Sequence, residues 1–175
     1  KIFCRYTSVL RKPKNIERKM PLLIDSNQLA HYGTWLEIRL DRLLQNFQAI
    51  QQTAGTQVKL MAVVKANAYG HGLLPVAKAL AGHVSYLGIA STREALALKE
   101  SGVTTPIFLF GALLPEELPP LLLNGITLSV SSYEEAERIS HLSESLSRTT
   151  RVHIKVDTGM GRLGLPLKEA FPIIE

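Results

Sequence analysis

The fold of this chain is decided by the stretch Leu60-Met61-Ala62-Val63-Val64-Lys65-Ala66-Asn67-Ala68-Tyr69-Gly70-His71-Gly72. Its first five residues are all apolar and predict a buried strand, which ends abruptly in a lysine. A loop follows at once and carries a tyrosine, a histidine and two glycines. We therefore predict that this strand delivers the Lys65 amine to the mouth of a site.

An amine at the end of a buried strand has a chemical use. Low local dielectric disfavours its charged form and frees a lone pair that attacks aldehydes. Lysines that form Schiff bases with pyridoxal phosphate are activated in this way. The alternative from spacing alone is an ordinary solvated lysine at the end of a strand.

After this strand the chain repeats one unit, a short apolar strand followed by a helix. Two of the helices open with a capping box, Ser91-x-x-Glu94 and Ser132-x-x-Glu135. The predicted strands are residues 60–65, 86–90, 107–110, 126–130 and 152–156. The predicted helices are 73–81, 91–102, a Pro-broken piece at 115–124, one that starts at 132, and one that starts at 167. Apolar strands that alternate with helices predict a parallel sheet covered on its outer face.

The residues before this repeat predict a strand and a helix of their own. Residues 34–40 alternate apolar and polar side chains, which is typical of a strand with one wet face. Asp41 is predicted to cap the helix that follows, and Gly55 to close it. The apolar stripe of this helix consists of Leu43, Leu44, Phe47 and Ile50.

Five strand–helix units fit either an open doubly wound sheet or part of a TIM-type (β/α)8 barrel. The barrel is favoured because the residues with useful chemistry follow the first and the fifth strands, and barrels gather their sites at the carboxyl ends of strands. A complete barrel takes about 250 residues. We therefore expect an α/β fold, a (β/α)8 barrel truncated after about five βα units.

The second informative stretch is Val152-His153-Ile154-Lys155-Val156-Asp157-Thr158-Gly159-Met160-Gly161-Arg162-Leu163-Gly164. Along a strand, His153, Lys155 and Asp157 share one face, because side chains alternate. Polar residues inside a barrel need a reason, since buried charge is costly unless paired. One reading is a packed ion pair of Lys155 with Asp157 or Arg162.

Both stretches resemble motifs of the alanine racemase family. The ten residues from Val63 resemble its pyridoxal-phosphate signature, which implies that Lys65 is the Schiff-base residue and that Tyr69 contacts the cofactor phosphate. The string from Lys155 to Gly164 resembles a motif whose lysine is commonly carbamylated. This implies N6-carboxylysine at Lys155, which orients Arg162 toward the phenolic oxygen of the cofactor. Gly159 and Gly161 are expected to let the backbone turn tightly between them.

The resemblance also sets the expected domain organisation. Residues 34–41, followed by Asn46, match the way these enzymes begin, so it covers about residues 34–175. These are expected to be the N-terminal portion of the pyridoxal-phosphate-binding barrel, with the C-terminal β-domain of the family absent. Residues 1–33 are expected to be a basic leader or linker of unknown role.

The family's activity implies interconversion of L- and D-alanine for bacterial peptidoglycan by a two-base mechanism. Lys65 is the implied base for the D-enantiomer, and the opposite base is a tyrosine from the partner subunit of a homodimer. Because that tyrosine belongs to the β-domain, we expect this chain, which looks like a fragment, to be inactive alone. The alternatives are a serine or broad-specificity amino-acid racemase, a pyridoxal-phosphate decarboxylase, or a non-catalytic pyridoxal-phosphate-binding remnant.

Charge and cysteine usage exclude several other classes of function. The net charge of +5 arises in residues 1–19, which carry seven basic side chains and one acidic one, whereas the other 156 residues carry 13 basic and 14 acidic. No basic face for nucleic acid is therefore expected. No apolar run approaches the roughly 20 residues of a membrane span. The lone Cys4 forms no internal disulfide, which favours the cytosol, and the family resemblance implies that of a bacterium.

The remaining histidines and the glycine turn at residues 70–72 are weaker candidates for binding a metal or the cofactor. No metal site is expected, because no acidic or thiol partner stands at ligand spacing from His31, His83 or His141. His71 either supports the cofactor loop or is simply exposed. The turn at residues 70–72 could offer its backbone amides to a phosphate.

Overall fold

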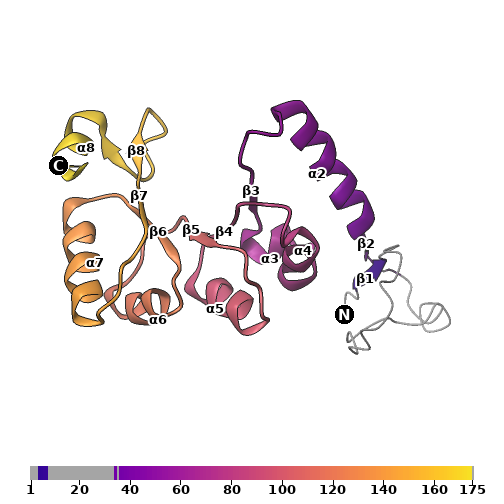
Figure 1. The fold of residues 1–175 in the computed structure, drawn as a ribbon, viewed down its shortest axis with the longest axis horizontal. Helices are drawn as coiled ribbons and strands as arrows, with labels where there is room; N and C mark the ends of the chain where they lie inside the picture. The colour runs from indigo at the N-terminus through magenta and orange to yellow at the C-terminus, as the bar shows by residue number, and fades with distance from the viewer. Residues whose placement is uncertain (1–3, 8–33, 35, 175) are drawn as a thin grey trace. The chain divides into compact units, whose positions relative to one another are not determined.

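The computed structural model describes residues 4–7, 34 and 36–174, with side chains described between residues 34 and 170. The chain divides into two compact units, residues 1–58 and residues 59–175 (Figure 1). Each unit is described by itself. No helix in the described part of the chain has the length and apolar character needed to cross a membrane.

In the first unit, the residues that the structure describes form two parallel strands and a helix. Strand β1 (Cys4–Thr7) pairs with β2 (Leu36–Arg39), a partner within residues 1–33 that the sequence did not predict. Helix α2 (Leu40–Ala54) follows β2 directly and ends at Gly55, as expected. The predicted boundary between residues 33 and 34 stays a prediction.

The prediction for Asp41 as the cap of α2 is wrong. The strand runs into the helix without a loop, so the cap position falls on Arg39, which makes no side-chain cap bond. Asp41 lies in the first turn, and its carboxylate pairs with the Arg39 guanidinium at 2.7 Å. The apolar stripe is only partly covered within the described chain, with Ile50 58% exposed.

The second unit is built on a five-stranded, wholly parallel sheet. Its strands are β3 (Met61–Val63), β4 (Tyr86–Ile89), β5 (Ile107–Leu109), β6 (Thr127–Val130) and β7 (Val152–Ile154). Its helices are α3 (Lys65–Tyr69), α4 (Leu73–Leu80), α5 (Thr92–Glu100), the 3₁₀ turn η1 (Pro115–Glu117), α6 (Leu118–Leu123), α7 (Tyr133–Ser145) and α8 (Leu167–Ile174). Two short strands, β8 (Val156–Asp157) and β9 (Leu165–Pro166), pair with each other after β7.

The strand order distinguishes a barrel from a doubly wound sheet. The strands lie in the sequential order β3-β4-β5-β6-β7, without the reversal that defines a doubly wound sheet. Helices α4 to α7 follow one another along the sheet, each in contact with the next (Figure 1). Sequential strands with a row of crossover helices form an arc of a (β/α)8 barrel. The fold prediction is confirmed.

The core lies between the sheet and these helices. Side chains on the outer face of the strands are fully buried, as are residues of the helices that cover them. The largest are Val64, Leu87, Ile89, Leu98, Ile107, Leu109, Leu121, Ile126, Leu128 and Val130. Burying each Leu or Ile contributes about 1.5–3 kcal/mol, so the outer face supplies most of the stabilisation of this unit.

The inner face of the sheet carries a cluster of rings. His153 lies opposite Ser129 in the register, and its ring centroid is 4.7 Å from that of Phe108 and 6.1 Å from that of Tyr86. A side chain at Gly88 would meet the Phe110 ring at 2.5 Å. The predicted inward position of His153 thus has a packing role, and the ring cluster explains the glycine in β4.

Candidate active site

The candidate site begins where β3 ends, as predicted, although the strand is shorter than residues 60–65. The Val64 amide still bonds the Gly88 carbonyl at 2.8 Å, and Lys65 is the first residue after this last link to β4. Its side chain is half-buried. The amine therefore lies at the carboxyl end of the first strand of the sheet.

The backbone after Lys65 turns in the left-handed sense. Four consecutive non-glycine residues have φ between 52° and 56°, namely Ala66, Asn67, Ala68 and Tyr69. Each such residue costs about 1–2 kcal/mol relative to a right-handed conformation. Strain of this kind persists only where the surroundings hold it, and it concentrates at functional sites.

Several hydrogen bonds within the turn hold it together. The Asn67 side-chain oxygen accepts from the Leu73 amide at 2.8 Å and so caps α4. The Asn67 carbonyl accepts from the amides of Gly70 and Gly72. The His71 Nδ1 donates to the Ala68 carbonyl at 2.9 Å, so His71 supports the turn although it is exposed. Tyr69 is left 58% exposed at the surface of the turn.

The prediction that residues 70–72 offer free amides to a phosphate is wrong. The Gly70 amide bonds the carbonyls of Ala66 and Asn67, the His71 amide bonds that of Ala68, and the Gly72 amide bonds that of Asn67. The left-handed turn brings these carbonyls within reach of the amides. The turn thus offers a ligand its side chains rather than these amides.

The second predicted group follows β7. The Lys155 amide continues the ladder to the Val130 carbonyl at 2.8 Å, while its own carbonyl accepts from the Leu165 amide at 2.8 Å. The chain changes partners at Lys155, which is why the predicted strand 152–156 is split into β7 and β8. The Lys155 side chain is half-buried, and Arg162 is exposed in the loop between β8 and β9.

The ion pair suggested for Lys155 is not formed. Among the residues that the structure describes, the one salt bridge joins Arg39 to Asp41. The Asp157 carboxylate instead accepts from the Gly159 amide at 2.8 Å and from the Gly161 amide at 2.7 Å. Both carboxylate oxygens therefore hold the glycine turn, in which Gly159 and Gly161 have φ of 134° and 65° as expected for the tight turn.

Protonation of Asp157 is expected to loosen this turn. The Gly159 amide, with help from Gly161, holds the pKa of the Asp157 carboxyl below its ordinary value of 3.8. Because the folded pKa is depressed, the stabilisation is present above 3.8 and is lost as pH falls through the folded pKa. NMR titration should show the Gly159 and Gly161 amide shifts moving together with a midpoint below 3.8. A midpoint at or above that value would contradict the assignment, and the Gly125 amide serves as the control.

The structure brings the predicted residues together in two groups. Lys65 and Tyr69 share one turn, whereas Lys155 directly precedes β8 and Arg162 lies in the loop between β8 and β9. The first group follows β3 and the second follows β7, the two end strands of the sheet. These strands are separated by four strand-to-strand spacings, each of about 4.8 Å. Since all five strands are parallel, both groups lie at the same edge, where a closed barrel gathers its site.

One polar residue at this edge was missed by the sequence analysis. The sequence predicts Glu94 only as the acidic residue of a capping box, yet its carboxylate accepts from the Asn67 amide at 3.1 Å. The two residues are 27 positions apart. Nothing in the spacing of Ser91 and Glu94 signals this contact, because it depends on β3 and β4 being neighbours.

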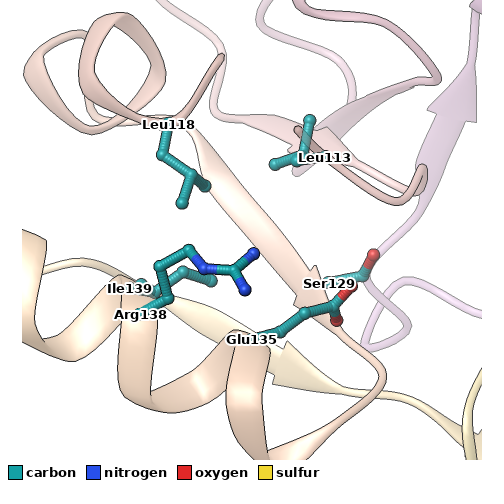
Figure 2. A pocket seen from close by; sticks show the side chains of 6 residues that line it. All are labelled: Leu113, Leu118, Ser129, Glu135, Arg138 and Ile139. Atoms are coloured by element: carbon teal, nitrogen blue, oxygen red, sulfur yellow. The ribbon is translucent and has the colours of Figure 1, made fainter. Parts of the chain in front are cut away.

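A pocket of about 260 Å³, a volume that includes open solvent, is separate from the candidate site. Figure 2 shows the Arg138 side chain extending from α7 into the pocket, between Leu118 and Glu135. The lining side chains are Leu113, Leu118, Ser129, Glu135, Arg138 and Ile139. It shares no residue with the predicted groups, so it adds nothing to the candidate site.

Comparison with known proteins places these features in one family. The model of the alanine racemase N-terminal domain matches residues 38–175. An alanine racemase of Methanococcus maripaludis is 43% identical over 149 residues, which are 84% of this chain and 40% of that protein. An alanine racemase of Caldanaerobacter subterraneus is 42% identical over 132 residues, 75% of this chain and 34% of that protein.

Solved structures agree with the sequence relatives. An alanine racemase of Clostridium difficile superimposes with a TM-score of 0.74 at 37% identity, over 77% of this chain and 36% of that one. The chain thus spans about two fifths or less of the length of these relatives. The matched region contains both predicted groups and the arc of parallel strands that carries them, and the chain belongs to the alanine racemase family through its N-terminal domain.

Proposed function

We propose that this chain supplies the cofactor-binding domain of a pyridoxal-phosphate-dependent alanine racemase, which interconverts L- and D-alanine. The observation that carries the proposal is the Lys65 amine at the carboxyl end of β3, followed by a strained turn that exposes Tyr69. Relatives support the substrate class. One Clostridium difficile structure is described as a complex with cycloserine, at 36% identity, and one from Bacillus anthracis as having bound L-Ala-P, at 35%.

The side chains at this edge fit pyridoxal phosphate. A primary amine suits its aldehyde, a phenol suits a phosphate oxygen, and a guanidinium suits a phenolate. Lys65 and Tyr69 supply the first two from one turn, and the exposed Arg162 supplies the third from the opposite end of the sheet. When bound, the cofactor withdraws electrons from the substrate α-carbon and so acidifies its proton.

The residues of this chain then hold the cofactor and move one proton. Lys65 would hold the cofactor through its Nζ, and the same nitrogen would remove or return the α-proton of D-alanine. Tyr69 would donate to the phosphate. A carbamate on Lys155 would orient Arg162 toward the phenolic oxygen. The base on the opposite face comes from the partner subunit of a homodimer, and the product D-alanine serves peptidoglycan synthesis in the bacterial cytoplasm.

Reductive trapping tests this proposal on the chain as it exists. The purified chain is mixed with pyridoxal phosphate and reduced with borohydride, and the modified peptide is located by mass spectrometry. We expect selective labelling of Lys65. Labelling that is absent, or scattered over the surface lysines, would overturn the assignment of this edge as a cofactor site.

Carbamylation of Lys155 has a separate test. With isotope-labelled bicarbonate at alkaline pH, where the free amine is populated, we expect a carbamate carbon signal in the NMR spectrum of the chain. The signal should disappear in Lys155→Ala and remain in Lys65→Ala, because only the first variant removes the proposed nitrogen. A carbamate signal that survives in Lys155→Ala would place the modification elsewhere.

A further inference from the structure

The Glu94 carboxylate joins the strained turn to the neighbouring strand. One of its oxygens accepts from the Asn67 amide at 3.1 Å, and the other accepts from the Ala90 amide at 3.2 Å. Asn67 is the second of the four left-handed residues, and Ala90 follows the last residue of β4. A single side chain thus fixes the middle of the turn against the edge of the sheet.

This contact goes beyond the capping of α5. In a capping box the acidic residue three positions after the cap returns its side chain to the amide of the cap, here Ser91. Ser91 does accept from the Glu94 amide, at 3.3 Å, but both Glu94 oxygens bond other amides. The Ser91 hydroxyl therefore caps the helix as in an ordinary capping box, whereas the Glu94 carboxylate binds the amides of Ala90 and Asn67 instead of that of Ser91.

The second capping box of the chain shows the difference. In α7, Ser132 accepts from the Glu135 amide at 3.1 Å, and Glu135 accepts from the Ser131 amide at 2.7 Å. These contacts correspond to those that Glu94 makes with Ser91 and Ala90. Among the hydrogen bonds of the described residues, Glu135 has no counterpart to the bond with Asn67.

The first turn of α5 is also held by a residue of the next strand–helix repeat. The Thr92 hydroxyl donates to the Glu117 carboxylate at 2.8 Å, and the other oxygen of Glu117 accepts from the Leu114 amide at 2.9 Å. The helix start that carries Glu94 is therefore fixed on both sides. Carboxylates connect three successive strand-to-helix loops at the edge where the cofactor is expected.

We propose that Glu94 is a positioning residue that locks the left-handed turn and so sets the placement of Lys65 and Tyr69; its consequence for the cofactor rests on the proposed function above. Glu94 touches neither substrate nor cofactor. It acts through Asn67, whose amide it binds and whose side chain caps α4.

The matched variants Glu94→Gln and Glu135→Gln test this in the full chain. Glutamine has one acceptor oxygen and a donating NH₂ group. At position 135 it can satisfy the single Ser131 amide. At position 94 it can satisfy only one of two amides, and we expect it to keep the Ala90 amide, which corresponds to Ser131, so that the Asn67 amide loses its acceptor. In Glu94→Gln we expect hydrogen exchange of the Asn67 amide to accelerate about tenfold or more, since a bond to a charged group is lost. Glu135→Gln should leave that exchange unchanged.

Cofactor affinity supplies the second readout. The apparent Kd for pyridoxal phosphate, measured by borohydride trapping at Lys65, should rise by about tenfold in Glu94→Gln and stay constant in Glu135→Gln. Equal changes in the two variants, or unchanged Asn67 exchange in Glu94→Gln, would overturn the proposal. Should Glu94→Gln fail to fold, Glu94→Asp, which keeps the charge but is one methylene shorter, is measured in its place with the same criteria.

The two readouts separate this proposal from the function it rests on. Exchange of the Asn67 amide is measured without cofactor, so it reports the lock whether or not pyridoxal phosphate binds. Suppose that the wild-type chain is labelled at Lys65 but that the Asn67 exchange rate is the same in Glu94→Gln. This result would refute the role of Glu94 and leave the proposed function intact. The opposite pattern would keep the lock and refute the cofactor assignment.

Discussion

Lys65→Ala is expected to abolish the borohydride-trapped incorporation of pyridoxal phosphate completely. The expectation follows from the position of the amine directly after the last ladder bond of β3, and residues 66–72 of the turn contain no other lysine. The fold should survive the change, because the turn is held by the bonds of Asn67, Ala68 and Gly70 rather than by the Lys65 side chain. Incorporation is measured by mass spectrometry of the tryptic peptides.

Two further variants test whether labelling requires the primary amine of Lys65 rather than its positive charge, and whether it is specific to this lysine. Lys65→Arg keeps a positive charge, but a guanidinium stays protonated and forms no bond with the aldehyde, so it should also abolish labelling. Lys78→Ala removes an exposed lysine of α4 and should change nothing at Lys65. The assignment is contradicted if Lys65→Ala retains the label or if Lys78→Ala loses as much.

The sequence predicts the features that depend on local pattern. The apolar run before Lys65 places the amine at a strand end because a buried strand needs apolar side chains and a lysine stops the run. Ser91 and Ser132 start their helices because the cap chemistry is contained within four residues. These local rules are enough to set out all five strand–helix units in order.

Features that depend on contacts between distant residues were not predicted. The left-handed turn contradicts the local preference of Ala66, Asn67, Ala68 and Tyr69, and tertiary bonds such as that from Glu94 support it. The split of the last strand at Lys155 depends on β9, ten residues later, taking over its carbonyl. The resemblance to the family identifies the residues of both groups. It does not predict the backbone conformation on which they lie, namely the left-handed turn and the split strand.

Leu121→Ala is expected to cost about 2–5 kcal/mol of unfolding free energy, the range for a leucine removed from a close-packed core. Leu121 is fully buried in α6, which contacts both α5 and α7. This helix has six residues and two prolines, Pro119 and Pro120. Its stability therefore comes from burial rather than from helix propensity, and the loss should weaken the layer that backs the sheet.

Leu123→Ala is the matched control, since Leu123 lies two residues along the same helix and is 53% exposed. Urea unfolding followed by far-UV circular dichroism should give it a change below about 0.5 kcal/mol. Domains are stable by only about 5–15 kcal/mol, so Leu121→Ala removes a large share of the total. Equal costs for the two variants would mean that α6 does not pack on the sheet as described. A large cost confined to Leu121→Ala, with labelling of Lys65 reduced in proportion to the unfolded fraction, would show that the outer core determines whether the cofactor edge forms at all.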